Sequence, residues 1–216
     1  MTPNKEDYLK CIYEIGTDMQ KITNKEIAAR MQVSPPAVTE MIKRMKSENL
    51  ILKDKENGYL LTDIGLKLVS ELYRKHRLIE VFLVHHLDYT SDQIHEEAEV
   101  LEHTVSDLFV KRLDKLLGFP QTCPHGGTIP AEGELLVEIN NLPLAAVQEA
   151  GTYLLTRVHD SFELLKYLEK HEIHIGDQVK VKQFDNFSNT FTLVNKDEDL
   201  QVSMDIAKQL YVEKIN

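Results

Sequence analysis

A run of acidic and histidine side chains at helical spacing lies in the middle of the chain. Residues three and four positions apart share one face of a helix, so Glu99, Glu102 and His103 project together if this run is helical. Upstream, His76 and Glu80 have the same spacing. Crowded carboxylates repel one another, and a bound divalent cation would relieve that repulsion. The pattern therefore indicates a metal site built on helices.

Other potential ligands lie elsewhere in the chain. Cys123 and His125 flank a proline and place a thiolate and an imidazole two residues apart, a good geometry for chelation. Asp7 lies on the first predicted helix, an unusual position for a carboxylate unless a cation meets it. Asp160 lies between a predicted strand and a predicted helix, where it is either a ligand or the N-cap of that helix. Cys11 has no such neighbours, and we expect it in the core.

Neither cluster alone decides between a metal site and a solvated surface. An acidic run on a helix is more often solvated, and this is what we expect of Glu96 and Glu97. Four more histidines are expected at the surface or in packing contacts: His85, His86, His171 and His174.

The N-terminal part of the chain has the pattern of two helices joined by a short linker. Thr2 followed by Pro3 predicts the start of a first helix, which ends at Gly16. Thr23 and Glu26 have the spacing of a capping box and predict a short second helix.

A third helix and a hairpin follow. Ser34 predicts the N-cap of a helix that reaches about Asn49. The next segment, 50–62, alternates and contains Asn57-Gly58, a strong hairpin signal. Helix, short helix, helix and hairpin together predict a winged helix-turn-helix.

The third helix is the candidate reader of DNA, since a recognition helix presents its N-terminal side chains to base edges while basic residues around it contact phosphates. The candidates are Lys25, Arg30, Ser34, Pro36, Ala37, Thr39, Glu40, Lys43, Lys46, Lys53 and Lys55. Glu40 is an awkward member, because a carboxylate near DNA must meet a cytosine amine or point aside. The alternative is a three-helix module that contacts proteins.

The remaining segments divide into a helical middle and a β-rich end. We expect helices at 62–87, 91–104 and 105–117, a turn-rich stretch at 118–133, strands at 153–158, 177–182, 184–194 and 201–204, and a helix at 161–170. The end of the chain is therefore predicted to be a small β-barrel with one helix.

The net charge of −10 is unevenly distributed. Residues 1–62 hold 10 basic and 9 acidic side chains, whereas the rest of the chain holds 15 and 26. DNA affinity needs a local basic surface, and the acidic excess falls where bound cations would offset it. The sequence has no long apolar run or signal-like start, and only two cysteines. We therefore expect a cytosolic protein without membrane contact.

Three stretches resemble the diphtheria-toxin repressor family, in particular its streptococcal manganese-responsive branch. They are Val33-Ser34-Pro35-Pro36-Ala37-Val38-Thr39, Arg74-Lys75-His76-Arg77-Leu78 and His95-Glu96-Glu97-Ala98-Glu99-Val100-Leu101-Glu102-His103. The resemblance covers the whole chain and is weakest near its end. It implies a mainly α fold with a small β part: a winged helix-turn-helix domain at 1–72, a helical dimerisation and metal-binding domain at 73–140, and an SH3-like β-barrel at 147–216 that is also similar to a ferrous-transport accessory protein.

The resemblance also implies two metal sites in each subunit. One would be built from Glu80, Cys123, His125 and Asp160. The other would involve Asp7, Glu99, Glu102 and His103, with His76 close to both.

The ligand types rank the metals. Iron-responsive members of the family have Met where this chain has Asp7, and Cys where it has Glu99 or Glu102. Oxygen in place of sulfur favours Mn²⁺, whereas the thiol of Cys123 also suits Fe²⁺. Mn²⁺ is therefore expected first, with Fe²⁺ as the second candidate.

The function that the resemblance implies is repression of metal-uptake genes by a homodimer that binds a palindromic DNA operator when loaded with metal. One alternative is a winged-helix regulator that answers another ligand, and a second is a non-catalytic sensor of Fe²⁺ or Zn²⁺. A di-metal enzyme is disfavoured because such helices use Glu-x-x-His motifs, and this chain has none. We expect no enzymatic activity.

Overall fold

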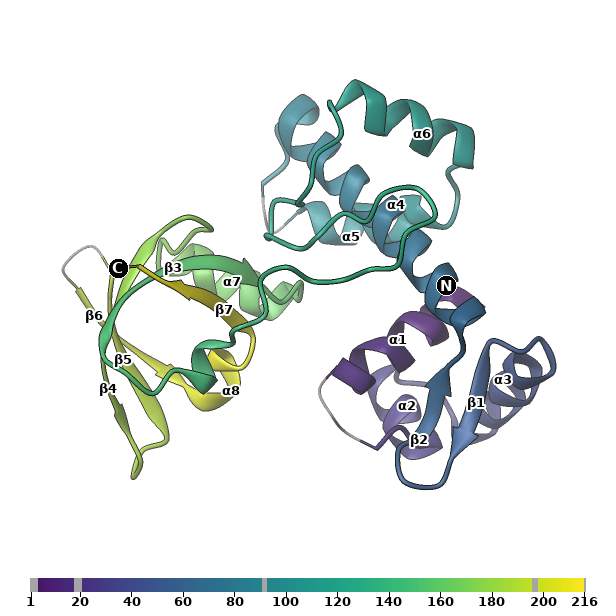
Figure 1. Cartoon of the computed structure of the whole chain (residues 1–216), viewed down its shortest axis with the longest axis horizontal. Coiled ribbons are helices and arrows are strands. Elements are labelled where there is room, and N and C mark those ends of the chain that lie inside the picture. The colour runs from purple at the N-terminus through teal and green to yellow at the C-terminus, as the bar shows by residue number, and fades with distance from the viewer. Residues whose placement is uncertain (1–3, 18–20, 91–92, 196–197, 216) are drawn as a thin grey trace. The chain divides into compact units, whose positions relative to one another are not determined.

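The computed structural model describes residues 4–17, 21–90, 93–195 and 198–215. The fold divides into two compact units, the first ending at Lys75 and including Pro130–Leu136, the second made of His76–Ile129 and the residues from Val137 onward. The long helix α4 (Asp63–Leu87) runs from the first unit into the second (Figure 1).

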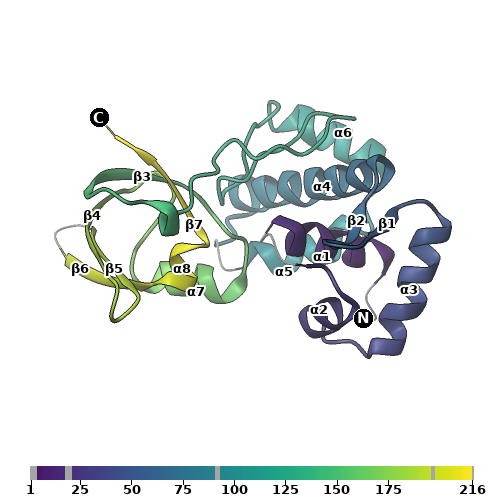
Figure 2. The same ribbon diagram turned by 60° about the horizontal axis from the view of Figure 1, so that its bottom comes forward.

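The first unit is a winged helix-turn-helix, as predicted. Its elements before α4 are α1 (Lys5–Thr17), α2 (Asn24–Arg30), α3 (Pro35–Ser47), β1 (Ile51–Asp54) and β2 (Gly58–Leu61). Apolar side chains from every one of the three helices, including Leu9, Ile27 and Val38, form one core with the start of the hairpin. In Figure 2, α3 lies next to α2, which it contacts, and the hairpin strands lie beside α1.

The start of α1 differs from the prediction in its cap. The side chain of Asn4 accepts hydrogen bonds from the backbone N–H groups of Glu6 at 2.6 Å and Asp7 at 3.2 Å, so Asn4 caps this helix. The predicted cap, Thr2 with Pro3, lies outside the described residues.

The caps of α2 and α3 are confirmed. Thr23 accepts a hydrogen bond from the N–H of Glu26 at 3.2 Å, and Ser34 accepts one from the N–H of Ala37 at 3.4 Å. The third helix ends before the predicted Asn49, whose φ of 56° lies outside the right-handed helical region.

The hairpin forms at the predicted place with a three-residue loop, since Asp54 pairs with Gly58 across the two strands. The carboxylate of Asp54 accepts the N–H of Asn57 at 2.7 Å and shapes this loop. Gly58 has a φ of 84°, and a Cβ there would lie 2.0 Å from the carbonyl oxygen of Ile22. Only glycine allows this close approach of the two backbones.

The helical part of the second unit holds the C-terminal portion of α4 with α5 (Ile94–Glu102) and α6 (Asp107–Leu116). Leu78, Ile94 and Leu113 belong to one apolar core shared by these helices. The fifth helix is shorter than predicted, and Ser91, its predicted start, lies outside the described residues. Ser106 caps α6 through the N–H of Phe109 at 3.2 Å, so this helix begins later than predicted.

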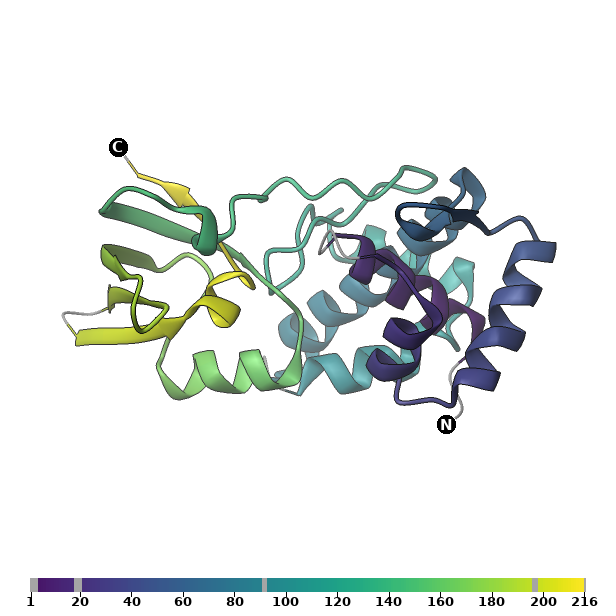
Figure 3. The same ribbon diagram turned by 90° about the horizontal axis from the view of Figure 1, so that it is seen from below.

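The β part of the second unit is a five-stranded antiparallel sheet in the order β6-β5-β4-β3-β7. Its elements are the 3-10 turn η1 (Leu144–Ala146), β3 (Gly151–Val158), α7 (Phe162–Lys170), β4 (Gln178–Asp185), β5 (Thr190–Asn195), β6 (Glu198–Ser203), α8 (Met204–Ala207) and β7 (Leu210–Lys214). Leu164 and Leu168 of α7 share a core with Leu155 of the sheet. Figure 3 shows α7, in light green, lying beside the strands.

Two features of this sheet differ from the prediction. The predicted strand at 184–194 is broken, because Asp185 accepts the N–H of Phe187 at 2.8 Å and turns the chain between β4 and β5. The last strand, β7, was not predicted, although it pairs with β3 along most of its length.

Within the described ranges, none of the helices combines the length and the apolar character that a bilayer crossing requires.

Candidate functional site

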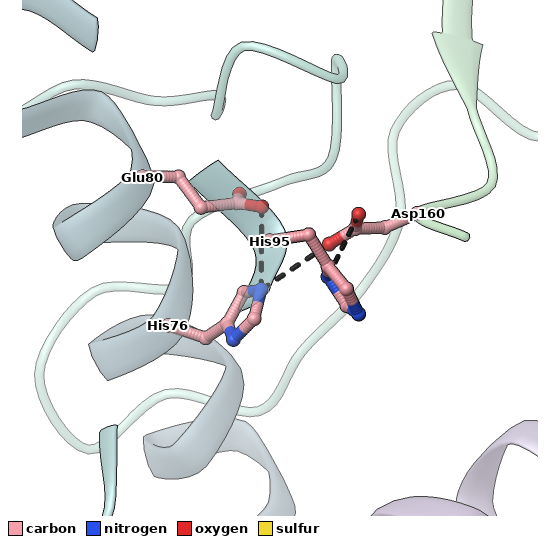
Figure 4. Close-up of side chains that lie close together, drawn as sticks. All are labelled: His76, Glu80, His95 and Asp160. Carbon is pink, nitrogen blue, oxygen red and sulfur yellow. Dashed lines mark hydrogen bonds and ion pairs between the residues drawn. The ribbon is translucent and has the colours of Figure 1, made fainter. Parts of the chain in front are cut away.

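The proposed metal centre begins on α4. His76 and Glu80 are one helical turn apart, and both side chains are buried, at 2% and 0% exposure. His76 Nε2 lies 3.2 Å from Glu80 Oε1 and also 3.2 Å from Asp160 Oδ2 (Figure 4). Asp160 lies in the short segment between β3 and α7, so the centre joins the helical part of the second unit to its sheet.

A second histidine on this cluster was missed by the sequence analysis. His95, in the first turn of α5, places Nδ1 3.0 Å from Asp160 Oδ1 (Figure 4). One atom each from His76, Glu80, His95 and Asp160 lie within 4.8 Å of one another. The sequence contains one indication of this role: His95 lies four residues before Glu99, so both share one face of the predicted helix.

The alternative role of Asp160, as the N-cap of α7, is wrong. Ser161 occupies the N-cap position, and its side chain makes no capping hydrogen bond. The carboxylate of Asp160 instead faces His76, His95 and His125, the last at 3.5 Å.

The loop between α6 and the linker to the sheet brings Cys123 and His125 to Glu80. All three side chains are buried, and one ligand atom from each lies within 4.8 Å of the others. The Nδ1 atom of His125 is 3.2 Å from Glu80 Oε1. The loop is a tight turn in which Gly126 donates its N–H to the carbonyl of Cys123 at 2.9 Å, with a φ of 78° at Gly126. The structure thus brings together Glu80, Cys123 and His125 as predicted, with Asp160 beside them.

Part of the predicted second metal site lies in the second unit. Glu99 and Glu102 are on α5, and His103 is the C-cap of that helix. Glu102 is buried, with Oε2 2.5 Å from His76 Nδ1 and Oε1 3.3 Å from His103 Nε2. Ligand atoms of His76, Glu99 and Glu102 lie within 4.8 Å of one another. Asp7 belongs to the first unit, where its carboxylate accepts the N–H of Asn4 at 2.6 Å, and its part in this site stays a prediction.

The imidazole of His76 is therefore contacted at both nitrogens. Glu102 lies at Nδ1, while Glu80 and Asp160 lie at Nε2. A carboxylate at one ring nitrogen fixes the orientation of the ring and the tautomer that the other nitrogen presents to a metal. Glu102 is placed to do this for His76.

The buried carboxylates require positive charge beside them. Burial and the charge of Asp160 oppose ionisation of Glu80, but His76 and His125 outweigh them and lower the pKa of Glu80. Burial likewise opposes ionisation of Asp160, and His76 and His95 beside it hold its pKa well below its ordinary value. The neighbouring imidazoles thus favour the ionised form of both carboxylates.

The pKa values of the loop residues respond to the same carboxylate. Burial alone would lower the pKa of His125, but the charge of Glu80 and the neighbouring Cys123 raise it to about 11. Burial and the charge of Glu80 raise the pKa of the Cys123 thiol. Metal binding would therefore require loss of protons from the imidazole and the thiol.

The donor atoms fit a transition-metal ion. Both carboxylate oxygens of Glu80, both ring nitrogens of His125 and Oδ1 of Asp160 are buried and lack a well-directed hydrogen bond to the described part of the chain. Buried polar atoms without such partners are costly, and a cation would satisfy several of them at once. The set of imidazole, carboxylate and thiol donors suits Mn²⁺, Fe²⁺ and Zn²⁺ better than Ca²⁺ or Mg²⁺.

The candidate DNA surface lies on the first unit. All eleven predicted DNA-contact residues are exposed. Three of them have side-chain partners within the protein. Arg30 Nη2 lies 3.3 Å from Glu14, the hydroxyl of Thr39 donates to the Pro35 carbonyl at 3.0 Å and accepts from Asn24 at 3.0 Å, and Ser34 caps α3. The part of all eleven residues in DNA binding stays a prediction.

Three family models match successive parts of the chain. Residues 1–59 match the N-terminal DNA-binding domain of the iron dependent repressors, and residues 62–131 match their metal binding and dimerisation domain. Residues 142–214 match the FeoA domain. The match to FeoA agrees with the predicted likeness of the C-terminal part to a ferrous-transport accessory protein.

Similar proteins give the same assignment. The chain is 63% identical to the manganese-activated repressor ScaR in a structure with bound Zn²⁺, covering 99% of this chain and 100% of that chain with a TM-score of 0.95. It is 58% identical to the manganese regulator SloR, covering 100% of both chains with a TM-score of 0.92. The diphtheria toxin repressor of Corynebacterium diphtheriae is 27% identical over 221 residues, which is 97% of this chain and 96% of that protein. The chain belongs to the iron dependent repressor family, whose members are metal-dependent, DNA-binding transcriptional repressors.

Proposed function

We propose that this protein is a manganese-responsive repressor that, as a homodimer, binds a palindromic operator and limits expression of metal-uptake genes. It would act in the cytoplasm, where its DNA target lies, and has no enzymatic role. The observation that carries the proposal is the cluster of His76 and Glu80, which are buried, with His95 and Asp160, which are partly buried. It joins helix α4 to the segment that follows β3 of the C-terminal sheet. The manganese-related names of ScaR and SloR support the choice of metal.

We assign one metal ion to the centre around Glu80. Glu80, Cys123, His125 and Asp160 would hold it, with His76 and His95 available beside Asp160. When bound, the ion would supply positive charge beside these carboxylates. Fe²⁺ is the second candidate, because Cys123 offers a sulfur ligand.

We assign a second ion to Asp7, Glu99, Glu102 and His103, with His76 close by. Asp7 lies on the first helix of the DNA-binding unit, and the other three lie on or directly after α5. A cation shared by these residues would favour one arrangement of the DNA-binding unit. If the cation binds that arrangement more tightly than the others, it raises the population of that arrangement, and the affinity of the protein for DNA rises with it.

The dimer would form through an apolar face of the second unit. A groove with a volume of about 200 Å³ is lined by Phe82 of α4 and by Phe109, Arg112, Leu113 and Leu116 of α6. Phe109 and Leu116 are 45% and 63% exposed, which is unusual for side chains of this size on one helix. Because the groove lies within the stretch that matches the family's dimerisation domain, we propose a second copy of the chain as its occupant. The proposed domains are the predicted 1–72, 73–140 and 147–216.

Selection of genomic DNA fragments tests the proposed function. The purified protein is stripped with a chelator, divided, and incubated with sheared genomic DNA with or without Mn²⁺. We expect Mn²⁺ to enrich fragments that share a palindrome with half-sites about one helical turn apart, or ~34 Å. Equal recovery of unrelated fragments in both samples would contradict a metal-dependent repressor.

A substitution of Lys43 tests the assignment of the DNA surface. Lys43 lies exposed on α3, and its ammonium would contact a phosphate. Lys43→Ala should weaken DNA binding at every sequence and reduce the salt dependence by about one counterion per lost contact. Lys180→Ala, an exposed lysine on β4, is the matched control. Calorimetry should find the same metal affinity in both variants, and a loss of metal binding in Lys43→Ala would contradict the separation of the two functions.

A further inference from the structure

The loop that carries Cys123 and His125 is held by a buried ion pair that does not itself belong to the metal centre. Arg77 follows His76 on α4, and its guanidinium donates through Nη1 to the carbonyl of Thr128 and through Nη2 to Glu138 Oε1 at 2.6 Å. The other oxygen of Glu138 accepts the N–H of Thr128 at 2.9 Å. Arg77 and Glu138 thus bind the backbone carbonyl and the backbone N–H of Thr128, at the end of the loop.

The backbone of Gly127 packs directly against the guanidinium of Arg77. A Cβ at position 127 would lie 2.7 Å from Cζ of Arg77 and 2.8 Å from Nη2. The Arg77 side chain is only 11% exposed and is engaged at both Nη atoms, so it has little freedom to move away. The absence of a side chain at position 127 therefore lets the guanidinium lie flat against the loop.

The opposite side of the loop is held by the sheet. The carbonyl of His125 accepts the N–H of Val158 at 3.0 Å, two residues before Asp160 on the same chain segment. Next to it, Arg157 places Nη1 3.9 Å from Glu138 Oε1 and donates through Nε to the carbonyl of Asn140 at 2.8 Å. The loop is therefore fixed at His125 by the sheet and at Thr128 by Arg77 and Glu138.

We propose that Arg77 and Glu138 are positioning residues for the metal centre, which hold Cys123 and His125 in the arrangement that faces Glu80. This inference rests on the proposed metal site. Affinity for a metal depends on how well the donor atoms are arranged before binding. Residues that contact and orient the ligands without touching the metal typically change the metal affinity 10- to 100-fold. Arg77 suits this position better than lysine would, since its planar fork serves a carbonyl and a carboxylate at once.

Two variants disturb the ion pair in different ways. Glu138→Gln removes the charge but keeps the size of the side chain. Gly127→Ala keeps every charge and displaces the guanidinium by contact. The matched control is Glu149→Gln, which breaks an exposed ion pair with Lys214 in the same unit and far from the loop in sequence. Thermal unfolding followed by circular dichroism establishes that each stripped variant is folded.

Calorimetric titration of the stripped dimer with Mn²⁺ should give about 10- to 100-fold weaker binding for Glu138→Gln and Gly127→Ala, and a change of less than about twofold for Glu149→Gln. Titration with Co²⁺ adds a signature of the ligand itself. The charge-transfer absorption of a cobalt–thiolate bond should weaken or shift in both loop variants and stay constant in the control, because Cys123 is the thiol in this centre.

A measurement without metal completes the test. In the stripped protein, hydrogen exchange at the Thr128 amide should be faster in Glu138→Gln, because this N–H donates to Glu138. Unchanged Mn²⁺ affinity and unchanged cobalt absorption in both variants would overturn the positioning role. If the unsubstituted protein itself bound no Mn²⁺ and gave no cobalt–thiolate band, the proposed metal centre around Glu80 would be wrong instead.

Discussion

Glu80→Gln should lower the affinity for Mn²⁺ by at least ~100-fold, the largest effect on metal affinity that we expect of a single substitution. Glu80 is fully buried on α4 and belongs both to the group with His76, His95 and Asp160 and to the group with Cys123 and His125. The glutamine keeps the shape of the side chain and removes its charge. The centre then loses the carboxylate common to both groups, and with it much of the attraction for a dication.

The measurement is calorimetric titration of the stripped protein with Mn²⁺, with Glu97→Gln as the matched control. Glu97 is an exposed carboxylate on α5 that the sequence analysis assigned to solvent. We expect its substitution to leave the titration unchanged. Equal Mn²⁺ affinity in Glu80→Gln and Glu97→Gln would remove Glu80 from the centre.

Leu116→Glu should weaken the dimer by roughly 1,000-fold. Leu116 lines the apolar groove on α6 and is 63% exposed in the single chain. In a symmetric dimer each substitution acts twice. Loss of one buried leucine costs about 2 kcal/mol, so two cost about 4 kcal/mol, and each 1.4 kcal/mol is about tenfold in the dissociation constant. The introduced carboxylate adds a desolvation cost in the same direction.

Sedimentation equilibrium measures this dissociation constant directly. Phe187→Glu is the control, since Phe187 lies fully exposed in the turn between β4 and β5, away from the groove in the fold. The control should remain as dimeric as the unsubstituted protein. If Leu116→Glu dimerises as tightly as Phe187→Glu, the groove is not the dimer interface.

The fold could be predicted from the sequence where local signals are strong. The capping residues Thr23 and Ser34 each accept the expected backbone N–H, and the turn around Asn57-Gly58 forms a hairpin at the predicted place. Such signals act over three or four residues, so a single sequence contains them entirely. The strand β7 was missed because its pairing with β3 joins residues more than 50 positions apart.

The site could be predicted in part for the same reason. The pairing of His76 with Glu80 is local, one turn of a helix, whereas the approach of Asp160 to them depends on how the sheet packs in the second unit. Asp160 was therefore identified through resemblance, with its role as a helix cap left open. His95 was missed because Glu96 and Glu97, which follow it, face solvent, while the carboxylate that it meets, that of Asp160, comes from the segment after β3.

Operator affinity with and without metal tests the central claim most directly. A duplex carrying the selected palindrome is labelled with a fluorophore and titrated with the stripped dimer and with the same preparation reloaded with Mn²⁺, at one fixed salt concentration. We predict that reloading increases the affinity about 5- to 150-fold, which corresponds to a coupling of about 1–3 kcal/mol. Identical binding curves for the stripped and the reloaded dimer would contradict a repressor controlled by its metal centre.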